Sequence, residues 1–148
     1  MIRIVCVGNL KEKYLIDACN EYIKRITKFD KIEIIECKES NLNPYSLALK
    51  NEACEIDKHL KGYVIKLAIE GSSYSSEQFA KKFEQIKING YSDITFIIGS
   101  SFGLDKSIRC DESFSFSKLT FPHQLARLML LEQIYRVETI LHHTPYHK

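Results

Sequence analysis

Hydrophobic and polar residues follow two different periods along the chain, one typical of strands and one typical of helices. Alternating or wholly apolar runs predict five strands, over residues 2–7, 32–37, 63–69, 93–98 and 114–120. Apolar residues spaced three and four apart predict helices over residues 14–29, 44–60, 75–86 and 122–141, with a short helix near 106–110. Strands and helices therefore alternate through the whole sequence.

Local signals mark where three helices begin. Ser75 and Gln78 have the spacing of a capping box, in which each side chain bonds the other residue's main-chain amide. Asn43 precedes Pro44 as a cap residue precedes a first-turn proline, and Pro122 opens the last helix. Alternating strands and helices require crossover connections between parallel strands. We therefore predict an α/β fold, with an open, mostly parallel sheet and helices on both faces.

Length and composition limit what this chain can be. Its 148 residues, 45% of them hydrophobic, suit a single domain spanning residues 1–148 with one well-buried core. No apolar run approaches the roughly 20 residues that cross a bilayer, so we expect no membrane segment. The first eight residues alternate like a strand and lack the apolar stretch of a signal peptide, so we expect a cytoplasmic protein.

Charge is uneven along the chain. The formal net charge is +2, but residues 1–112 are balanced, so the excess comes from residues 113–148. Four of the five histidines lie there too. This favours RNA or phosphate near the C-terminus, although ordinary surface variation explains so small an excess equally well. The five cysteines include no C-x-x-C pair, so we expect reduced, structural thiols and no metal site.

Three segments follow predicted strands at the edge where ligands bind in open α/β sheets. They are Glu70-Gly71, Gly99 to Leu104, and Thr120 to His123. Gly99 and Gly103 bracket a tight loop, where missing side chains let the backbone approach a ligand or adopt a positive φ. The loop lacks the pattern and position of a dinucleotide fingerprint, and no P-loop lysine follows it. A plain structural turn explains the same two glycines.

The last helix combines an anion-binding start with apolar residues on several sides. His123 and Gln124 stand in its first turn, where unpaired amides favour anions, although a capping or surface role is common for such a histidine. Leu125, Leu128, Ile134 and Tyr135 spread round the helix, as in a dimer-forming element. A core helix in a monomer gives the same pattern.

The chain ends in Tyr146-His147-Lys148, which offers stacking, hydrogen bonding and a phosphate contact. These are the groups that recognise an unstacked RNA base. A frayed terminus is the plain alternative.

Four motifs stand in order along the chain: Gly99-x-x-x-Gly103-Leu104, Ser115-Phe-Ser-Lys-Leu-Thr-Phe-Pro-His-Gln124, Leu131-Glu-Gln-Ile-Tyr-Arg136 and Tyr146-His-Lys148. Together with the opening Val7-Gly-Asn-Leu-Lys-Glu-Lys-Tyr14, they resemble the RlmH family of small SPOUT methyltransferases over essentially the whole chain. The resemblance implies an S-adenosyl-L-methionine-dependent enzyme that methylates N3 of a pseudouridine in 23S rRNA of the large ribosomal subunit. It also implies a C-terminal trefoil knot and a homodimer with each cofactor pocket completed near the interface.

By matching positions, the resemblance implies a cofactor pocket lined by Leu67, Gly99, Phe116, Ser117, Lys118, Leu119, Thr120 and Phe121, with Gly103 and Leu104 shaping the adjoining loop. Ser100 departs from the family pattern, because many relatives carry a second glycine there. Its Cβ would lie beside the cofactor. No metal is required for methyl transfer.

The proton on pseudouridine N3 must leave, so a histidine that titrates near neutral pH is the expected base. Both His123, beside the inferred cofactor run, and His147, in the tail motif, fit that role. We expect Tyr146 and three cations to contact the RNA substrate instead, since cations are poor bases. These cations are Arg127, Arg136 and Lys148.

Two other functions fit the same residues. One is a SPOUT methyltransferase acting on transfer RNA, and the other is a non-catalytic nucleotide-binding α/β module. The small net charge gives little attraction to naked RNA, so we expect the assembled ribosome as partner rather than free RNA. We expect no DNA partner.

Overall fold

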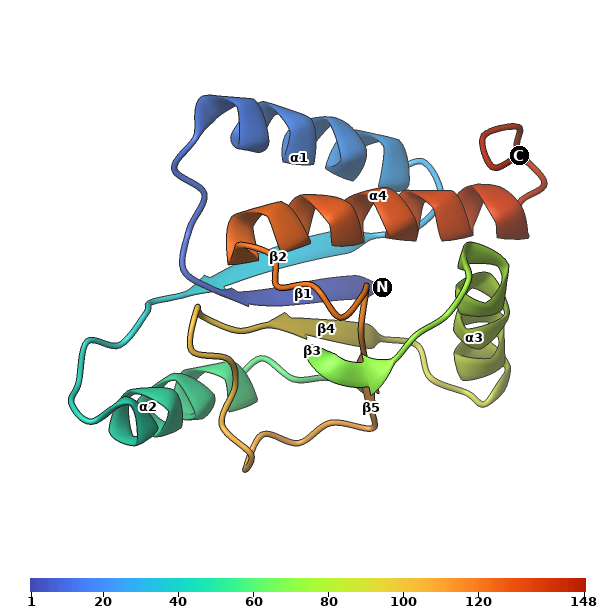
Figure 1. Ribbon diagram of the computed structural model, residues 1–148. Helices are drawn as coiled ribbons and strands as arrows, with labels where there is room; N and C mark the ends of the chain where they lie inside the picture. The colour runs from blue at the N-terminus through green and yellow to red at the C-terminus, as the bar shows by residue number, and fades with distance from the viewer.

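All five strands run in the same direction and form one open sheet in the computed structural model, which describes residues 1–148 (Figure 1). The strands are β1 (Ile2–Val7), β2 (Ile32–Cys37), β3 (Tyr63–Ser72), β4 (Ile94–Ile98) and β5 (Glu112–Phe114). Their order across the sheet is β2-β1-β4-β3-β5, and every neighbouring pair is parallel. The predicted α/β class and parallel sheet are confirmed, and the first two strands have the predicted bounds.

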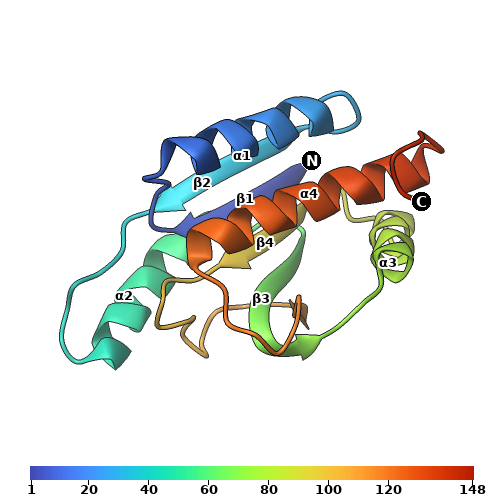
Figure 2. The ribbon, with the colours of Figure 1, turned by 45° about the horizontal axis from the view of Figure 1, so that its top comes forward.

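Four helices cover the sheet: α1 (Lys13–Ile26), α2 (Tyr45–Asp57), α3 (Ser76–Ile88) and α4 (His123–Leu141). Right-handed crossovers decide which face each connection takes. The steps from β1 to β2 and from β3 to β4 run the same way across the sheet, so α1 and α3 share one face. The step from β2 to β3 runs the other way and puts α2 on the opposite face (Figure 2).

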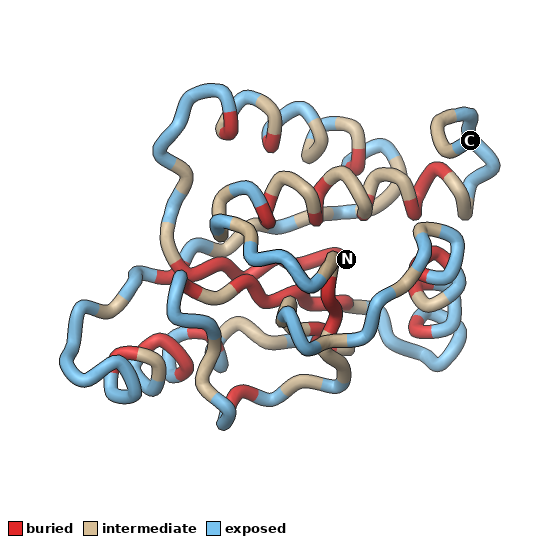
Figure 3. The backbone as a smooth tube through the Cα atoms, in the orientation of Figure 1, coloured by how far each residue is buried: buried red, intermediate tan, exposed pale blue.

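Each face of the sheet has its own hydrophobic core, and β1 contributes to both because its side chains alternate. Ile4 and Cys6 belong to the larger core, which packs against α1, α3 and α4. Val5 and Val7 belong to the smaller core under α2. Every residue of β1 and β4 is buried, which makes these two strands the centre of the molecule (Figure 3). Cys6, Cys19 and Cys37 are buried, whereas Cys54 is exposed, and none of the five cysteines forms a disulfide.

The capping box of α3 is confirmed, but the predicted cap of α2 is wrong. Ser75 Oγ accepts a hydrogen bond from the Gln78 amide at 3.1 Å, and Gln78 Oε1 accepts one from the Ser75 amide at 2.9 Å. At α2, Pro44 itself occupies the N-cap position in an extended conformation. Asn43 therefore lies one residue too early to cap the helix.

Two predicted elements differ in the structure. Residues 106–110 form a turn rather than a helix, because Asp105 Oδ1 accepts the Ser107 amide at 2.9 Å and closes the chain locally. Ile108 then enters the core under α2. The fifth strand ends at Phe114 instead of residue 120, because serine hydroxyls in residues 115–121 bond main-chain groups nearby.

Helix α4 packs between α1 and α3 and buries several of its sides within one protomer. Leu130, Leu131, Ile134 and Val137 are all inaccessible to solvent. This packing accounts for the apolar residues round the helix without a second subunit. None of the four helices has the length and hydropathy needed to cross a bilayer.

Glu138 is the one carboxylate of α4 that lies wholly inside the protein, with 0% of its surface exposed. Neither carboxylate oxygen has a hydrogen-bond partner, and the nearest basic groups are Lys87 Nζ at 3.6 Å and the His142 ring, with Nδ1 at 3.5 Å. Burial raises the pKa of Glu138, and the charge of Lys87 lowers it less. Since the folded state holds this proton more tightly than the unfolded chain, ionisation costs stability as the pH rises through the folded pKa.

We therefore predict that Glu138→Gln stabilises the protein at neutral pH. The gain should be about 1 kcal/mol, or about 2–4 °C in Tm for a chain of this size. It should vanish near pH 4, roughly the ordinary carboxyl pKa, below which the wild-type side chain is already neutral. Thermal melts across a pH series measure this. Glu55→Gln is the control, because that exposed carboxylate pairs with Lys58 and should give no gain. A gain of Glu138→Gln that persisted in acid would point to packing instead of charge.

Candidate active site

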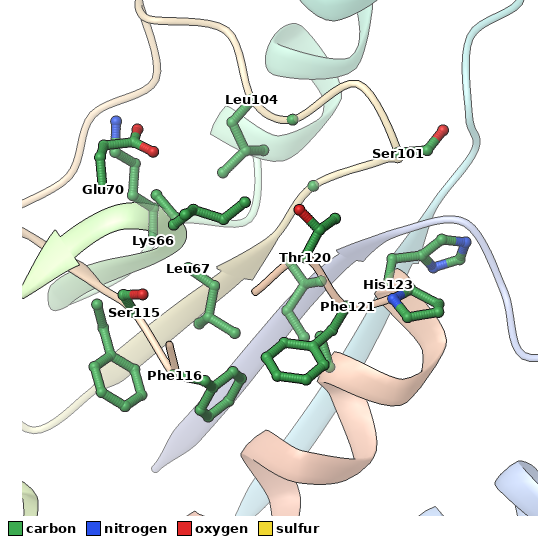
Figure 4. A pocket seen from close by; sticks show the side chains of 18 of the residues that line it. Lys66, Leu67, Glu70, Ser101, Leu104, Ser115, Phe116, Thr120, Phe121 and His123 are labelled. Atoms are coloured by element: carbon green, nitrogen blue, oxygen red, sulfur yellow. The ribbon is translucent and has the colours of Figure 1, made fainter. Parts of the chain in front are cut away.

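Three segments that follow strands surround one cavity of about 790 Å³ (Figure 4). Residues 66–70 lie within β3, residues 98–104 run from the last residue of β4 into the following loop, and residues 114–123 lead from β5 into α4. The prediction that the strand-end segments meet at one edge of the sheet is confirmed. Sequence reasoning did not single out Lys66, Ala68 and Ile69, although the position of their strand end could have indicated them.

An irregularity in β3 opens the room for this cavity. Leu67 and Ser72 both pair with Phe114 of β5, so the four residues between them leave the ladder. Gly71 lies so close to β5 that an added Cβ would be 2.7 Å from the Phe114 backbone. Residues 68–70 consequently bow out of the sheet and line the cavity.

The loop after β4 is closed by its own backbone. The Gly103 amide donates to the Ser100 carbonyl at 2.9 Å, and Gly103 has φ +87°, a value that favours glycine. A Cβ on Gly99 would lie 2.5 Å from the Gly103 carbonyl oxygen. Gly99 is therefore required for loop closure. The expected positive φ is found at Gly103 and not at Gly99, and the close approach of a ligand to this backbone stays a prediction.

Residues 115–121 form a second loop, and all of them except Lys118 line the cavity. Ser115 Oγ donates to the Ser117 carbonyl at 2.8 Å, and Ser117 Oγ accepts the Leu119 amide at 3.0 Å. This turn directs Phe116, Ser117, Leu119, Thr120 and Phe121 to the cavity. Lys118 of the same loop is exposed and does not line it.

Of the other residues inferred for the cofactor pocket, four line the same cavity: Leu67, Gly99, Gly103 and Leu104. Ser100 lines it as well, and its buried Oγ has no hydrogen-bond partner. At the position that departs from the family pattern, the hydroxyl is thus buried near Glu52 of α2 and is not exposed to the cavity.

His123 begins α4 and lines the cavity from the side of β1. Its ring packs on Gly8, where an added Cβ would lie 3.0 Å from His123 Cε1. Burial lowers the pKa of His123, and the nearby Lys11 and Arg127 charges lower it further against the opposing charge of Glu39. The imidazole is therefore uncharged near neutral pH and able to accept a proton.

Arg127 lies one turn along α4 and faces the sheet, not the solvent. Its Nη1 donates to Glu36 Oε2 at 2.9 Å, and its Nη2 donates to the Gly8 carbonyl at 3.1 Å. The side chain is almost fully buried. The structure thus uses Arg127 to tie α4 to the ends of β1 and β2, and leaves no donor exposed to an RNA phosphate, contrary to the expected contact.

The tail residues lie at the other end of α4. Arg136 bonds Glu132, and its Nη1 lies 3.2 Å from His147 Nδ1. His147 Nε2 donates to Glu77 Oε1 at 2.8 Å, and Tyr146 packs on Tyr135. Because Arg136 follows His123 by thirteen residues, this cluster lies about 20 Å along the helix from His123. The two candidate bases, His123 and His147, are not brought together in one protomer.

A second hollow of about 540 Å³ lies beside α4, between the cavity and the tail. Its α4 wall includes Met129, Glu132 and Gln133. Residues 114–116 line both this hollow and the cavity, so they form the wall between the two. No group of three or more His, Cys, Asp or Glu side chains is arranged to hold a metal ion.

Comparison with known proteins identifies the family. A family model described as "Predicted SPOUT methyltransferase" matches residues 1–147. Three similar proteins are named ribosomal RNA large subunit methyltransferase H. Those of Streptococcus thermophilus and Caldicellulosiruptor bescii are both 48% identical to this chain, covering 99% and 100% of each sequence, respectively. That of Leuconostoc mesenteroides is 45% identical over 99% of each. The chain therefore belongs to the SPOUT methyltransferase family.

Proposed function

We propose that this chain is a 23S rRNA methyltransferase, which transfers a methyl group from S-adenosyl-L-methionine to N3 of a pseudouridine in the large ribosomal subunit. The observation that carries the proposal is the cavity at the carboxyl ends of the strands, which nine of the ten inferred cofactor residues line. The names of the relatives favour ribosomal RNA over transfer RNA. Residues 1–148 would act as one domain, and family membership implies a C-terminal trefoil knot.

The cavity residues fit this cofactor in size and chemistry. A volume of about 790 Å³ lies within the usual range for small-molecule sites. Leu67, Phe116 and Phe121 offer apolar surface to a purine ring and an aliphatic chain. The Thr120 hydroxyl and the main-chain groups of the two loops offer hydrogen bonds to the polar groups of the ligand.

When bound, S-adenosylmethionine supplies a methyl group on a positively charged sulfur. The two loops of this chain hold that ligand against the sheet edge, so most of the rate enhancement comes from positioning. The apolar side chains keep water away from the reacting atoms. His123 accepts the proton that pseudouridine N3 loses, because it is the histidine that lines the cavity and burial keeps it neutral.

The tail serves the site only from a second subunit. In its own protomer, His147 lies about 20 Å along α4 from the cavity end and is bonded to Glu77. The cavity rim is apolar and open, with Leu119 69% exposed, as a surface covered on association would be. We infer a homodimer in which Tyr146, Lys148 and Arg136 of one protomer contact RNA at the cavity of its partner.

The net charge of +2 supports the assembled ribosome as the substrate, because a chain with so little charge attracts naked RNA weakly. Such a substrate would place the enzyme in the cytoplasm.

The function is tested by incubating the protein with labelled S-adenosylmethionine and ribosomes, free large subunits or transfer RNA. We expect label in 23S rRNA, and nuclease digestion followed by mass spectrometry should locate it on N3 of a pseudouridine. Label in transfer RNA alone would refute the proposed substrate. Binding of the cofactor without transfer to any RNA would favour a non-catalytic module.

We predict that Gly99→Ala weakens S-adenosylmethionine binding by about tenfold or more, since its Cβ must displace the Gly103 carbonyl that shapes the cavity. Calorimetry measures the affinity. S-adenosylmethionine at 100 times its Kd should raise the free energy of unfolding of the wild-type protein by about 2.7 kcal/mol. Gly90→Ala is the control: φ of +93° makes it strained by about 1 kcal/mol, but nothing lies within 4 Å and the site is remote. If Gly99→Ala and Gly90→Ala lost the same affinity for S-adenosylmethionine, the loss would come from general destabilisation and not from the shape of the cavity.

We predict that His123→Gln lowers the maximal rate by about 10²–10⁴-fold and removes the acidic limb of the pH–rate profile. The limb arises because the wild-type imidazole loses its ability to accept a proton when the pH falls below its lowered pKa. His147→Gln should keep the limb. The reverse pattern would transfer the role of base to His147. Mixing His123→Gln with a chain lacking residues 146–148 should restore activity if the tail acts across the dimer.

A further inference from the structure

Two aromatic rings stack on the surface beside the loop that follows β4. Tyr45 begins α2 and Phe102 belongs to the loop, and their ring centroids lie 3.9 Å apart with an interplanar angle of 24°. Tyr45 is 59% exposed and Phe102 is 52% exposed. Each ring covers one face of the other, so the outer faces remain in contact with solvent.

Phe102 lies between two residues that line the cavity, Ser101 and Gly103, although neither ring of the pair lines it. Ser101, the residue before Phe102, lines the cavity on the same side as His123 (Figure 4). Leu42 and Leu47, which flank Tyr45 in the sequence, are also more than two-fifths exposed. Exposed apolar patches next to a site mark a surface that binds something.

The surroundings of the pair match single-stranded RNA better than a protein. Four lysines in the segments that follow the strands form no salt bridge: Lys11, Lys38, Lys106 and Lys118. Glu39 and Asp105 lie at the same edge, and Asp105 already accepts the Ser107 amide. Lysines at the same edge of the sheet as exposed stacked rings form a combination that binds unstacked bases and their phosphates.

We propose that Tyr45 and Phe102 form a stacking platform for an unpaired rRNA base next to the target nucleotide. The proposal rests on the proposed function, because it needs an RNA substrate at this cavity. A base that continues the Tyr45–Phe102 stack would be held beside the cavity, with its phosphates at the edge of the sheet that carries these lysines. Because every base has an aromatic face, the platform adds affinity and orientation with little sequence preference.

Phe102→Leu and Phe102→Tyr separate stacking from plain apolar contact. Leucine keeps an apolar side chain without a ring, so the KM for ribosomes should rise about tenfold, the order expected for losing one base–aromatic stack. Tyrosine should keep the wild-type KM. Tyr45→Leu should behave like Phe102→Leu. Calorimetry with S-adenosylmethionine should give the same Kd for all variants. Tyr91→Leu, an exposed tyrosine at the opposite edge of the sheet, is the control and should change neither value.

The outcomes distinguish this proposal from the proposed function. Wild-type protein that methylates no rRNA overturns the function, whereas active wild type with an unchanged KM for Phe102→Leu overturns the platform alone. If Phe102→Leu weakened cofactor binding as much as it raised the KM for ribosomes, Phe102 would serve to hold the loop in shape, and the platform would be refuted. A photoreactive phenylalanine analogue at position 102 should crosslink to 23S rRNA, and crosslinking to a ribosomal protein instead would also overturn the proposal.

Discussion

Parallel strands joined by right-handed crossovers are the constraint on which the rest of this structure depends. Once all five strands point the same way, their carboxyl ends share one edge, and every chain segment that leaves a strand begins there. The handedness sends α1 and α3 to one face, and α2 with the 99–111 connection to the other. The cavity is therefore a consequence of topology: it lies where the exits of β3, β4 and β5 meet.

The regular elements could be predicted because their signals are local and periodic. Residues 2–7 and 32–37 match the sequence pattern because strands buried on one or both faces require it. Residues 115–120 carry the same kind of pattern without forming a strand. There the serine hydroxyls compete for main-chain groups, and the β3 irregularity removes the partner that a longer β5 would need.

Individual site residues were harder to predict, because their roles depend on distant partners. Arg127 resembles a phosphate contact in the sequence, but Glu36, ninety-one residues earlier, occupies its guanidinium. His147 resembles a base, but the length of α4 separates it from the cavity of its own protomer. Motif matching still identified the two loops that line the cavity, since each loop is set by short-range bonds within a few residues.

The wall formed by residues 114–116 has a thermodynamic consequence. This wall borders the cofactor cavity on one side and the hollow along α4 on the other. The same three side chains therefore contact whatever binds in either hollow. Binding linkage is reciprocal. If a molecule bound in the α4 hollow changes the affinity for the cofactor by some factor, the bound cofactor changes the affinity for that molecule by the same factor. Affinities for the two hollows are thus joint properties of the protein.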